Sequence, residues 1–259
     1  MERLYRVARN GDTFHVIERE GRISRLRLRG RTIFDGYDVG EPLHGGLGGC
    51  IVLAPVRPTK FVCVGLNYRD HAAEMKKALP PEPMIFFKPA TAVLDPGAPI
   101  LLPRGVGRVD YEAELAVVIG RHAHRVPRAR ASEYVFGVTA VNDVTARDIQ
   151  NKEVQYTRAK SFDTFGPLGP CIATGLGGAA RSVECWINGA RRQGSTTEQL
   201  IFPIDFLIEY ITFVMTLEPG DVISTGTPSG VGPLIAGDVV TVKVDGVGEL
   251  TNPVRAEEA

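Results

Sequence analysis

The stretch VDYEAELAVVIG, residues 109–120, places two glutamates inside an otherwise strongly apolar run. Successive side chains of a β-strand point to opposite faces, so Glu112 and Glu114 share one face. Ala116 and Val118 follow on that face, which indicates that it enters a core. Two ionised carboxylates about 6–7 Å apart repel by roughly 2–3 kcal/mol at an effective dielectric near 20. Either one carboxyl keeps its proton or a cation lies between the two.

Asp143 is a third acid, at the end of the apolar run VFGVTAVND, residues 135–143. Taken alone, Asp143 is equally consistent with an N-cap of the next helix. The two glutamates are likewise consistent with the solvent-exposed face of a half-buried strand. Together the three acids offer hard oxygen ligands without cysteine or histidine. Such a set suits Mg²⁺, Mn²⁺ or Ca²⁺ better than Zn²⁺, with remaining positions open to water or a chelating substrate.

Two pairs of polar residues have helical spacing. His71 and Glu74 lie three residues apart on a predicted helix, where Glu74 could fix the tautomer of a general base. A surface histidine beside a routine acid is the alternative interpretation. Arg147 and Gln150 have the same spacing one turn past Asp143, so both could lean over the same site.

The loop STGTPSGVG, residues 224–232, follows an apolar strand and is rich in hydroxyl groups and glycine. Its backbone N–H groups and the Thr227 hydroxyl could bind a carboxylate, and an ordinary turn is an equally good interpretation. Lys160, within RAKSFDTFGP, is a lone lysine in a mixed stretch. Spacing alone assigns it no role.

The composition is that of an ordinary globular protein. The 259 residues are 44% hydrophobic and 23% charged, enough for one large domain or a large domain with a small companion. Thirty basic residues balance thirty acidic ones, so no net field favours nucleic acid or an anionic membrane. The start MERLYRVARN lacks a signal core and no run is long enough to span a bilayer, so we expect a cytoplasmic protein without a membrane partner.

Residues 1 to about 43 predict a small antiparallel β unit, with a hairpin turn at Asn10-Gly11. Its arginines alternate with leucines, which indicates a solvated strand face and not a nucleic-acid surface. Glycine and proline mark a linker at 44–60, and the glycines of GGLGG match no nucleotide-binding template, so no organic cofactor is expected. We therefore predict domains at 1–57 and 58–259.

The second domain is predicted to be rich in strands. Its helices are few: residues 69–79 before Pro80, 145–153 with a Thr145/Asp148 capping box, and 203–217 after Pro203. Apolar runs predict strands at 61–68, 84–88, 113–120, 135–143, 222–227 and 239–250, the last a hairpin through Asp245-Gly246. The fold class is α+β, predominantly β, without βαβ alternation.

In combination these motifs resemble the fumarylacetoacetate hydrolase family, from about Lys60 to Val254. The resemblance depends on eight stretches in the family's order: VGLNYRDHAAEM, FFKPATAV, DYEAELAVVIG, NDVTARDIQ, AKSFDTFGP, IFPIDFLIEYI, TLEPGDVISTGTPSGVGP and GVGELTNPV. It implies a mixed β-roll catalytic core, a homodimer, and a small N-terminal β domain of the kind found in some bacterial members.

The resemblance also implies roles for the candidate residues. Glu112, Glu114 and Asp143 match acids that bind Mg²⁺ or Mn²⁺. His71 and Glu74 match a pair that activates water or shuttles protons, on a segment that acts as a lid. The remaining matches are Lys160 as a catalytic group near the substrate, and Gln150, Thr227 and Arg147 as substrate-binding residues.

The implied chemistry is that of a small 2-oxo acid whose enolate is stabilised by the metal ion. The implied activity is 2-hydroxyhepta-2,4-diene-1,7-dioate isomerase or 5-oxopent-3-ene-1,2,5-tricarboxylate decarboxylase, in aromatic catabolism. Acylpyruvate hydrolase of the fumarylpyruvate type and oxaloacetate decarboxylase are alternatives, since the His71–Glu74 pair would serve water activation equally well. An inert metal-stabilised binding module is a further alternative, and the presence of His71 argues against it.

Overall fold

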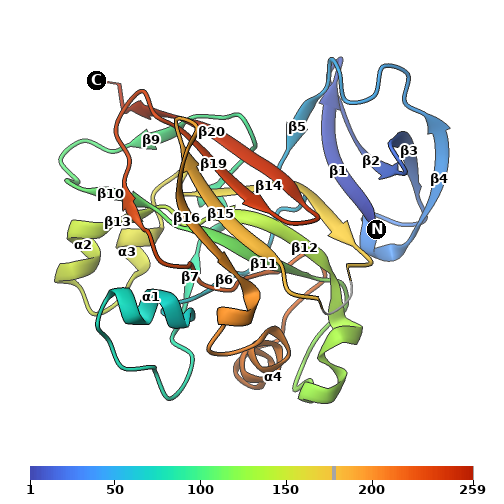
Figure 1. Ribbon diagram of the computed structural model, residues 1–259. Coiled ribbons are helices and arrows are strands. Elements are labelled where there is room, and N and C mark those ends of the chain that lie inside the picture. The colour runs from blue at the N-terminus through green and yellow to red at the C-terminus, as the bar shows by residue number, and fades with distance from the viewer. Residues whose placement is uncertain (177–178, 259) are drawn as a thin grey trace.

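The computed structural model describes residues 1–176 and 179–258, and it is mostly β (Figure 1). Residues 177–178 and 259, which fall inside the predicted second domain, lie outside the described residues. A twelve-stranded mixed sheet runs in the order β4-β3-β2-β1-β14-β12-β11-β17-β6-β7, with β5 paired to β1 and β8 to β14. Its strands are β1 (Glu2–Arg9), β2 (Asp12–Arg19), β3 (Arg22–Leu28), β4 (Tyr37–Pro42), β5 (Ile51–Leu53), β6 (Phe61–Val64), β7 (Ile85–Lys88), β8 (Val93–Leu94), β11 (Ala113–Ile119), β12 (Val135–Asn142), β14 (Gly166–Thr174) and β17 (Val222–Ser224).

A small three-stranded sheet continues the middle of the large one. Its order is β13-β10-β18, with β10 (Val109–Tyr111), β13 (Thr145–Ala146) and β18 (Gly232–Pro233). The same three segments of chain form β12, β11 and β17 in the large sheet, in the same order. The chain therefore crosses from one sheet to the other three times, side by side.

A five-stranded sheet, ordered β16-β15-β19-β20-β9, packs against the large one. Its strands are β9 (Ile100–Leu102), β15 (Ser182–Ile187), β16 (Ala190–Thr196), β19 (Val239–Val244) and β20 (Gly248–Ala256). Alternate residues of β19 point inward, so Val240, Val242 and Val244 join a buried apolar cluster with Val117 of β11. The main core lies between these layers.

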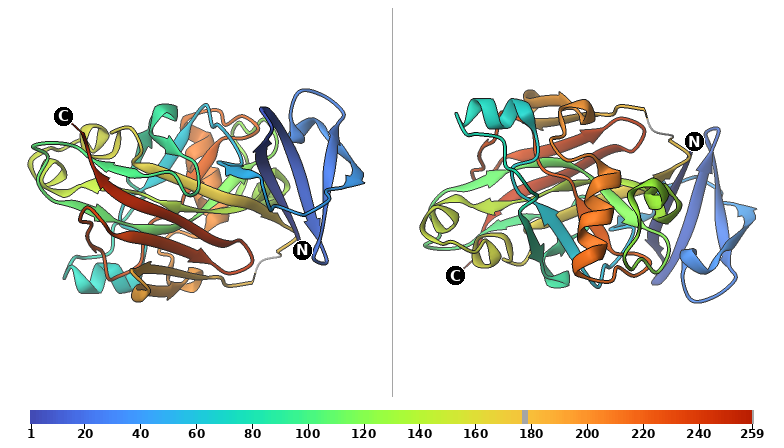
Figure 2. Two further views of the ribbon diagram at one scale, coloured as in Figure 1. Left: turned by 90° about the horizontal axis from the view of Figure 1, so that it is seen from above. Right: turned by 90° about the horizontal axis from the view of Figure 1, so that it is seen from below.

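The helices are short and lie at the edges of the sheets. They are α1 (Arg69–Glu74), α2 (Arg147–Lys152), α3 (Thr157–Lys160) and α4 (Ile204–Val214), with 3-10 turns η1 (Ile33–Asp35), η2 (Ala90–Ala92), η3 (Arg128–Tyr134) and η4 (Thr197–Gln199). Figure 2 shows α2 and α3 at one end of the molecule and the N-terminal strands at the other. No helix in the described part of the chain has the length and apolar character that crossing a membrane requires.

The N-terminal strands are joined to the rest of the chain. β1 pairs with β14 through Leu4↔Ile172, and the hairpin at Asn10-Gly11 is confirmed, both residues having positive φ. Leu4 and Ile17 pack in one apolar cluster with Val118 of β11. The division at residue 57 and the homodimer stay predictions.

Several predicted elements end earlier than expected: the strands at 61–68 and 222–227 stop at Val64 and Ser224, and the helix at 203–217 stops at Val214. The run 109–120 is not one strand, because it changes sheet at Glu112. The helix expected at 69–79 stops at Glu74, since Lys76 takes a left-handed φ of 53° that a helix cannot accommodate.

The predicted capping box is wrong. Thr145 belongs to β13, and its hydroxyl donates back to the carbonyl of Asp143 at 2.8 Å. Asp148 accepts instead from the backbone N–H of Arg108 at 3.1 Å. The hairpin through Asp245-Gly246 and the mixed, predominantly β fold are confirmed.

Candidate active site

Three carboxylates meet where the chain changes sheet. Glu112 lies between β10 and β11, Asp143 directly follows β12, and Glu114 is the second residue of β11. Because Ala113 pairs with Asn142, the backbone N–H of Asp143 donates to the carbonyl of Glu112 at 2.8 Å. One oxygen from each acid lies within 4.8 Å of the others, and all three side chains are buried. The pairing of β11 with β12 thus brings together acids that are distant in sequence.

Two buried lysines hold these acids. The Lys160 ammonium donates to Glu112 at 2.7 Å and to Asp143 at 2.6 Å. Lys88 lies 2.7 Å from the other Asp143 oxygen and donates to the carbonyls of Val144, Lys160 and Phe165 at 2.8–3.0 Å. Burial would lower the pKa of Lys160, but Asp143 and Glu112 outweigh it and raise that pKa. Lys160 therefore stays protonated and positively charged.

Glu112 and Glu114 titrate in opposite directions. Burial acts against ionisation of Glu112, yet Lys160 and Arg147 outweigh it and lower its pKa to about 2. Burial, followed by the neighbouring Asp143, raises the pKa of Glu114 well above its ordinary value. One Glu114 oxygen accepts from Ser224 at 2.5 Å and from the Gly226 N–H at 2.8 Å.

The three acids fit a divalent cation. Their donors are all carboxylate oxygens, the hard ligands that Mg²⁺, Mn²⁺ and Ca²⁺ prefer. Both Asp143 oxygens already lie against cations, Oδ1 at 2.7 Å from the Lys88 ammonium and Oδ2 at 2.6 Å from that of Lys160. The Lys160 ammonium itself bridges two of the acids, which shows that this position favours positive charge.

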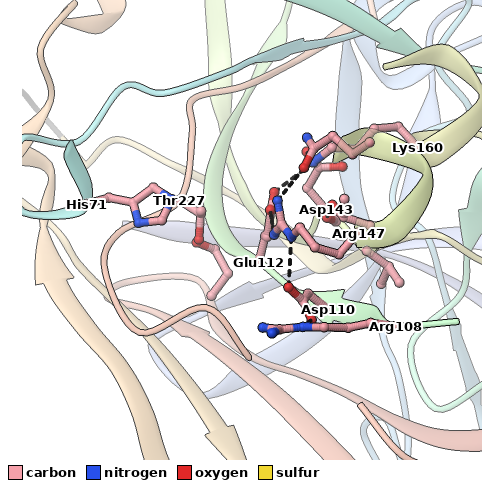
Figure 3. A network of polar contacts seen from close by, with 12 residues as sticks. His71, Arg108, Asp110, Glu112, Asp143, Arg147, Lys160 and Thr227 are labelled. Carbon is pink, nitrogen blue, oxygen red and sulfur yellow. Dashed lines mark hydrogen bonds and ion pairs between the residues drawn. The ribbon is translucent and has the colours of Figure 1, made fainter. Parts of the chain in front are cut away.

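A cavity of about 670 Å³ opens beside the acids and gathers the other candidates. Eight of the nine predicted residues line it: His71, Glu74, Glu112, Glu114, Arg147, Gln150, Lys160 and Thr227. Asp143 does not line it, but its carboxylate is bonded to Lys160, which does. In Figure 3, His71 and Thr227 lie on one side of Glu112, and Lys160, Asp143 and Arg147 on the other.

His71 is oriented from its Nδ1 side. That nitrogen lies 3.0 Å from a Glu74 oxygen, and the Glu74 carboxylate also accepts from the Gly230 N–H at 3.1 and 3.2 Å. The His71 backbone N–H donates to Asp70, whose other oxygen accepts from Ser195 of β16 at 2.5 Å. With Nδ1 protonated toward Glu74, Nε2 is the nitrogen left to accept a proton.

Arg147 at the start of α2 links several groups. Its guanidinium donates to Glu112 at 2.5 Å, to Asp110 at 2.8 Å and to Gln150. Burial would lower the pKa of Arg147, but Glu112 and Asp110 outweigh it and raise that pKa. Since each of its three nitrogens is bonded within the protein, Arg147 neutralises and positions Glu112 in this structure.

Thr227 is held by a residue that sequence analysis missed. Its hydroxyl donates to the Ala113 carbonyl at 2.9 Å and accepts from buried Gln193 at 2.8 Å. Gln193 also accepts from the Ala113 N–H and donates to the Pro228 carbonyl. β16 thereby attaches the loop after β17 to the start of β11.

Two further residues were missed and had usable signals. Asp110 continues the alternation of Glu112 and Glu114 backward by one step, and it is equally buried. Lys88 is a lone lysine that ends the apolar run MIFFK before Pro89, a position where a buried charge needs partners. Gln193 lies in a polar hairpin and had no such signal.

The fold and the site define a class of protein: a mixed β protein whose sheets meet at a buried acidic site suited to a divalent metal, beside an oriented histidine. The chain belongs to the fumarylacetoacetate hydrolase family. The family model "Fumarylacetoacetate (FAA) hydrolase C-terminal" matches residues 60–255. The expected family is confirmed.

Two solved structures and one relative show which family members this chain is similar to. A 2-hydroxyhepta-2,4-diene-1,7-dioate isomerase from Mycobacterium marinum shares 38% identity and a TM-score of 0.90, covering 100% of both chains. A fumarylpyruvate hydrolase from Pseudomonas aeruginosa, in complex with Mn²⁺ and pyruvate, shares 33% identity and a TM-score of 0.72, covering 80% of this chain and 92% of that one. The mitochondrial oxaloacetate tautomerase of Xenopus laevis is 41% identical over 221 residues, 78% of this chain and 68% of that protein.

Proposed function

We propose that this protein is a divalent-metal-dependent enzyme acting on small 2-oxo or 2-hydroxy-dienoic acids. The activity we favour is isomerisation of 2-hydroxyhepta-2,4-diene-1,7-dioate, or decarboxylation of the linked 5-oxopent-3-ene-1,2,5-tricarboxylate, in aromatic catabolism. The likeness to the M. marinum isomerase over both whole chains supports this activity over the others.

The observation that carries the proposal is the charge balance of the site. Four buried or half-buried cations face four buried carboxylates: Lys88, Arg108, Arg147 and Lys160 against Asp110, Glu112, Glu114 and Asp143. A metal ion bound to Glu114 would displace the proton that its raised pKa favours, so all eight groups are then ionised and the cluster is neutral. The divalent ion therefore brings an excess of two positive charges. The reacting end of a 2-oxo acid enolate carries two negative charges, on its adjacent carboxylate and its enolate oxygen, and these match that excess.

Glu112, Glu114 and Asp143 would hold the ion, which when bound supplies a Lewis acid for the oxygens of a 2-oxo acid. Lys160 places its ammonium at the same cavity wall, where it adds positive charge beside the developing enolate. Thr227 lines the cavity on the other side of Glu112, and its hydroxyl would donate to a substrate carboxylate after giving up its bond to the Ala113 carbonyl. Gln150, bonded to Arg147, lines the same wall.

His71 is the proton carrier in this proposal. Glu74 accepts from Nδ1–H, so Nε2 takes a proton from substrate carbon during isomerisation or from water during hydrolysis. Decarboxylation needs no base to start, because the C–CO₂ bond supplies the electron pair of the enolate.

A second candidate is C–C hydrolysis of an acylpyruvate, with oxaloacetate decarboxylation beside it. The intact His71–Glu74 pair and the similarity to the P. aeruginosa hydrolase favour it. All these reactions share the enolate, so the reaction is decided by which bond the pocket aligns.

The test is turnover of a hydroxy-dienedioate, acetylpyruvate and oxaloacetate by protein loaded with Mg²⁺ or Mn²⁺, before and after a chelator. We expect the dienedioate to be the best substrate and chelation to lower turnover about 100-fold or more, reversibly. His71→Ala should reduce isomerisation and hydrolysis more than decarboxylation, by roughly 10²-fold or more. Turnover that survives complete metal removal would falsify the proposal, and a clear preference for acetylpyruvate would select the second candidate.

A further inference from the structure

Arg108 differs from the other cations at the cavity. Lys160 and Arg147 direct their N–H groups to protein acids. Arg108 also lines the cavity, yet its side chain is 49% exposed and only Nε is bonded, to Asp110 at 2.6 Å. Among the described residues, its two terminal nitrogens have no hydrogen-bond partner. The terminal N–H groups of Arg108 are therefore available to a ligand in the cavity.

The guanidinium is nevertheless held in place. Asp110 is 1% exposed; one of its oxygens accepts from Arg108 and the other from Arg147. The Arg108 backbone is fixed at both ends, its N–H donating to Asp148 and its carbonyl accepting from the Arg147 N–H at 2.8 Å. The orientation of Arg108 is therefore set without the terminal N–H groups. An anion can use them with little further ordering cost.

Arg108 lies at a useful distance from the acidic site. Arg108, Asp110 and Glu112 alternate along one extended run, and each step of two residues advances about 6.6 Å. Figure 3 shows Arg108 beyond Asp110, on the side of Glu112 away from Lys160. The cavity continues from Glu112 to Arg108, since both residues line it. A substrate bound at the three acids can extend toward the guanidinium.

We propose that Arg108 binds a second carboxylate, at the far end of the substrate, and so makes the site selective for dicarboxylic 2-oxo acids. The terminal N–H groups form the fork that recognises a carboxylate through two parallel hydrogen bonds. The inference rests on the proposed function, which places the 2-oxo end at Glu112, Glu114 and Asp143. The inference adds the residue that binds the carboxylate at the other end of the substrate.

Lys77 is the rival for this role. It also lines the cavity and is exposed, and its ammonium has no hydrogen-bond partner among the described residues. It follows Lys76 on the segment after α1, and nothing fixes its flexible side chain. Glu74 and Glu153 are further cavity acids that could repel a second carboxylate. Glu74 accepts from His71 and the Gly230 N–H, and Arg158 neutralises Glu153 at 2.7 Å. Arg108 is therefore better positioned than Lys77 to bind the second carboxylate.

The experiment measures binding, so it does not depend on which reaction occurs. Protein loaded with Mg²⁺ is titrated calorimetrically with 2-oxoadipate and with 2-oxohexanoate, which differ only in a terminal carboxylate against a methyl group. We expect the wild type to bind 2-oxoadipate about tenfold more tightly or better. Arg108→Met should bring the two affinities within about twofold of each other, because only 2-oxoadipate has a terminal carboxylate for Arg108 to bind.

Two further variants sharpen the result. Arg108→Lys keeps the charge without the fork, so an intermediate preference is expected. Lys77→Met should keep the full preference. A preference that survives Arg108→Met, or disappears in Lys77→Met, overturns the inference. If Arg108→Met binds neither acid, Arg108→Lys decides, and a full wild-type preference in that variant overturns the inference. If the wild type binds neither acid in a Mg²⁺-dependent way, the proposed function itself fails.

Discussion

Glu112 and Glu114 are two residues apart, yet the protein treats them differently. Glu112 faces Lys160 and Arg147 and stays ionised, while Glu114 meets neutral donors from Ser224 and Gly226 and has a raised pKa. Repulsion between the two acids is thus relieved in one of the two ways that their spacing predicted, because Glu114 favours its proton, whereas the cations lie beside Glu112 and not between the two glutamates. One acid gains a cation and the other favours its proton.

Asp143 is the residue whose substitution best tests the site. Asp143→Asn keeps the shape and one oxygen acceptor for the lysines, but weakens the acidic set. For the wild type we expect Mg²⁺ at 100 times its dissociation constant to raise the free energy of unfolding by about 2.7 kcal/mol, because only the folded chain has the site. Urea unfolding with and without Mg²⁺ measures this, and the asparagine variant should show almost no increase.

Asp143→Ala is the harsher comparison for the same measurement. It leaves the ammonium groups of Lys88 and Lys160 buried without that partner, which should cost about 3–5 kcal/mol even without metal. An alanine variant as stable as the wild type would show that these ion pairs do not hold the site. Equal Mg²⁺ stabilisation of the asparagine variant would exclude Asp143 as a ligand.

At the scale of elements, the site exists because three neighbouring segments of chain pass from the large sheet to the small one at adjacent positions. β11, β12 and β17 of the large sheet continue as β10, β13 and β18 of the small one. Backbone groups at such a junction leave the regular ladder, and the Glu112 N–H donates to the Asn142 side chain at 3.0 Å. The interruption places Glu112, Asp143 and the loop after β17 around one point.

Gly230 in that loop connects it to α1. Its φ is +95°, its N–H donates to Glu74, and an added Cβ would lie 2.2 Å from the Arg192 carbonyl oxygen. Gly237 has a φ of +98° and open space around a Cβ, so it is a matched control for the backbone conformation. Alanine at either position should cost about 1–2 kcal/mol in φ alone.

Gly230→Ala should lower both the stability and kcat/KM more than Gly237→Ala does. The backbone clash must move the loop, so the free energy of unfolding should fall further than in Gly237→Ala, and kcat/KM should fall about tenfold or more as Glu74 loses its anchor. Gly237→Ala should keep wild-type kcat/KM. Thermal unfolding and steady-state kinetics on both variants measure the difference, and equal effects would argue against a positioning role for Gly230.

At the scale of the whole molecule, the N-terminal unit and the site share one sheet. β1 pairs with β14, β14 pairs with β12, and Asp143 follows β12. Apolar side chains of the first 57 residues pack into the same clusters as those of β11 and β14. The unit therefore closes an edge of the sheet that supports the site.

Deletion of residues 1–57 tests how independent the predicted second domain is. The truncated chain exposes the β14 edge and the partners of Leu4 and Ile17, so we expect loss of a cooperative thermal transition or aggregation. Circular dichroism during heating, with light scattering, compares it with the full chain. A cooperative transition within a few degrees of the full-length value would instead support a self-sufficient domain beginning near residue 58.

Local chemistry determined the parts that sequence analysis predicted correctly. Apolar runs marked β11 and β12, Asn10-Gly11 supplied a residue pair that tolerates positive φ, and acids in apolar runs indicated a cation site. The helix after Tyr68 was predicted too long, because the left-handed turn at Lys76 has no strong local signal.

Only the tertiary structure decided which buried charges meet. Lys88 and Asp143 are 55 residues apart and Gln193 and Thr227 are 34 apart, and no periodicity links such positions. Strand pairing sets those contacts, and it depends on the packing of the whole sheet. The sequence by itself determined which residues could do chemistry, and long-range pairing decided which of them share a cavity.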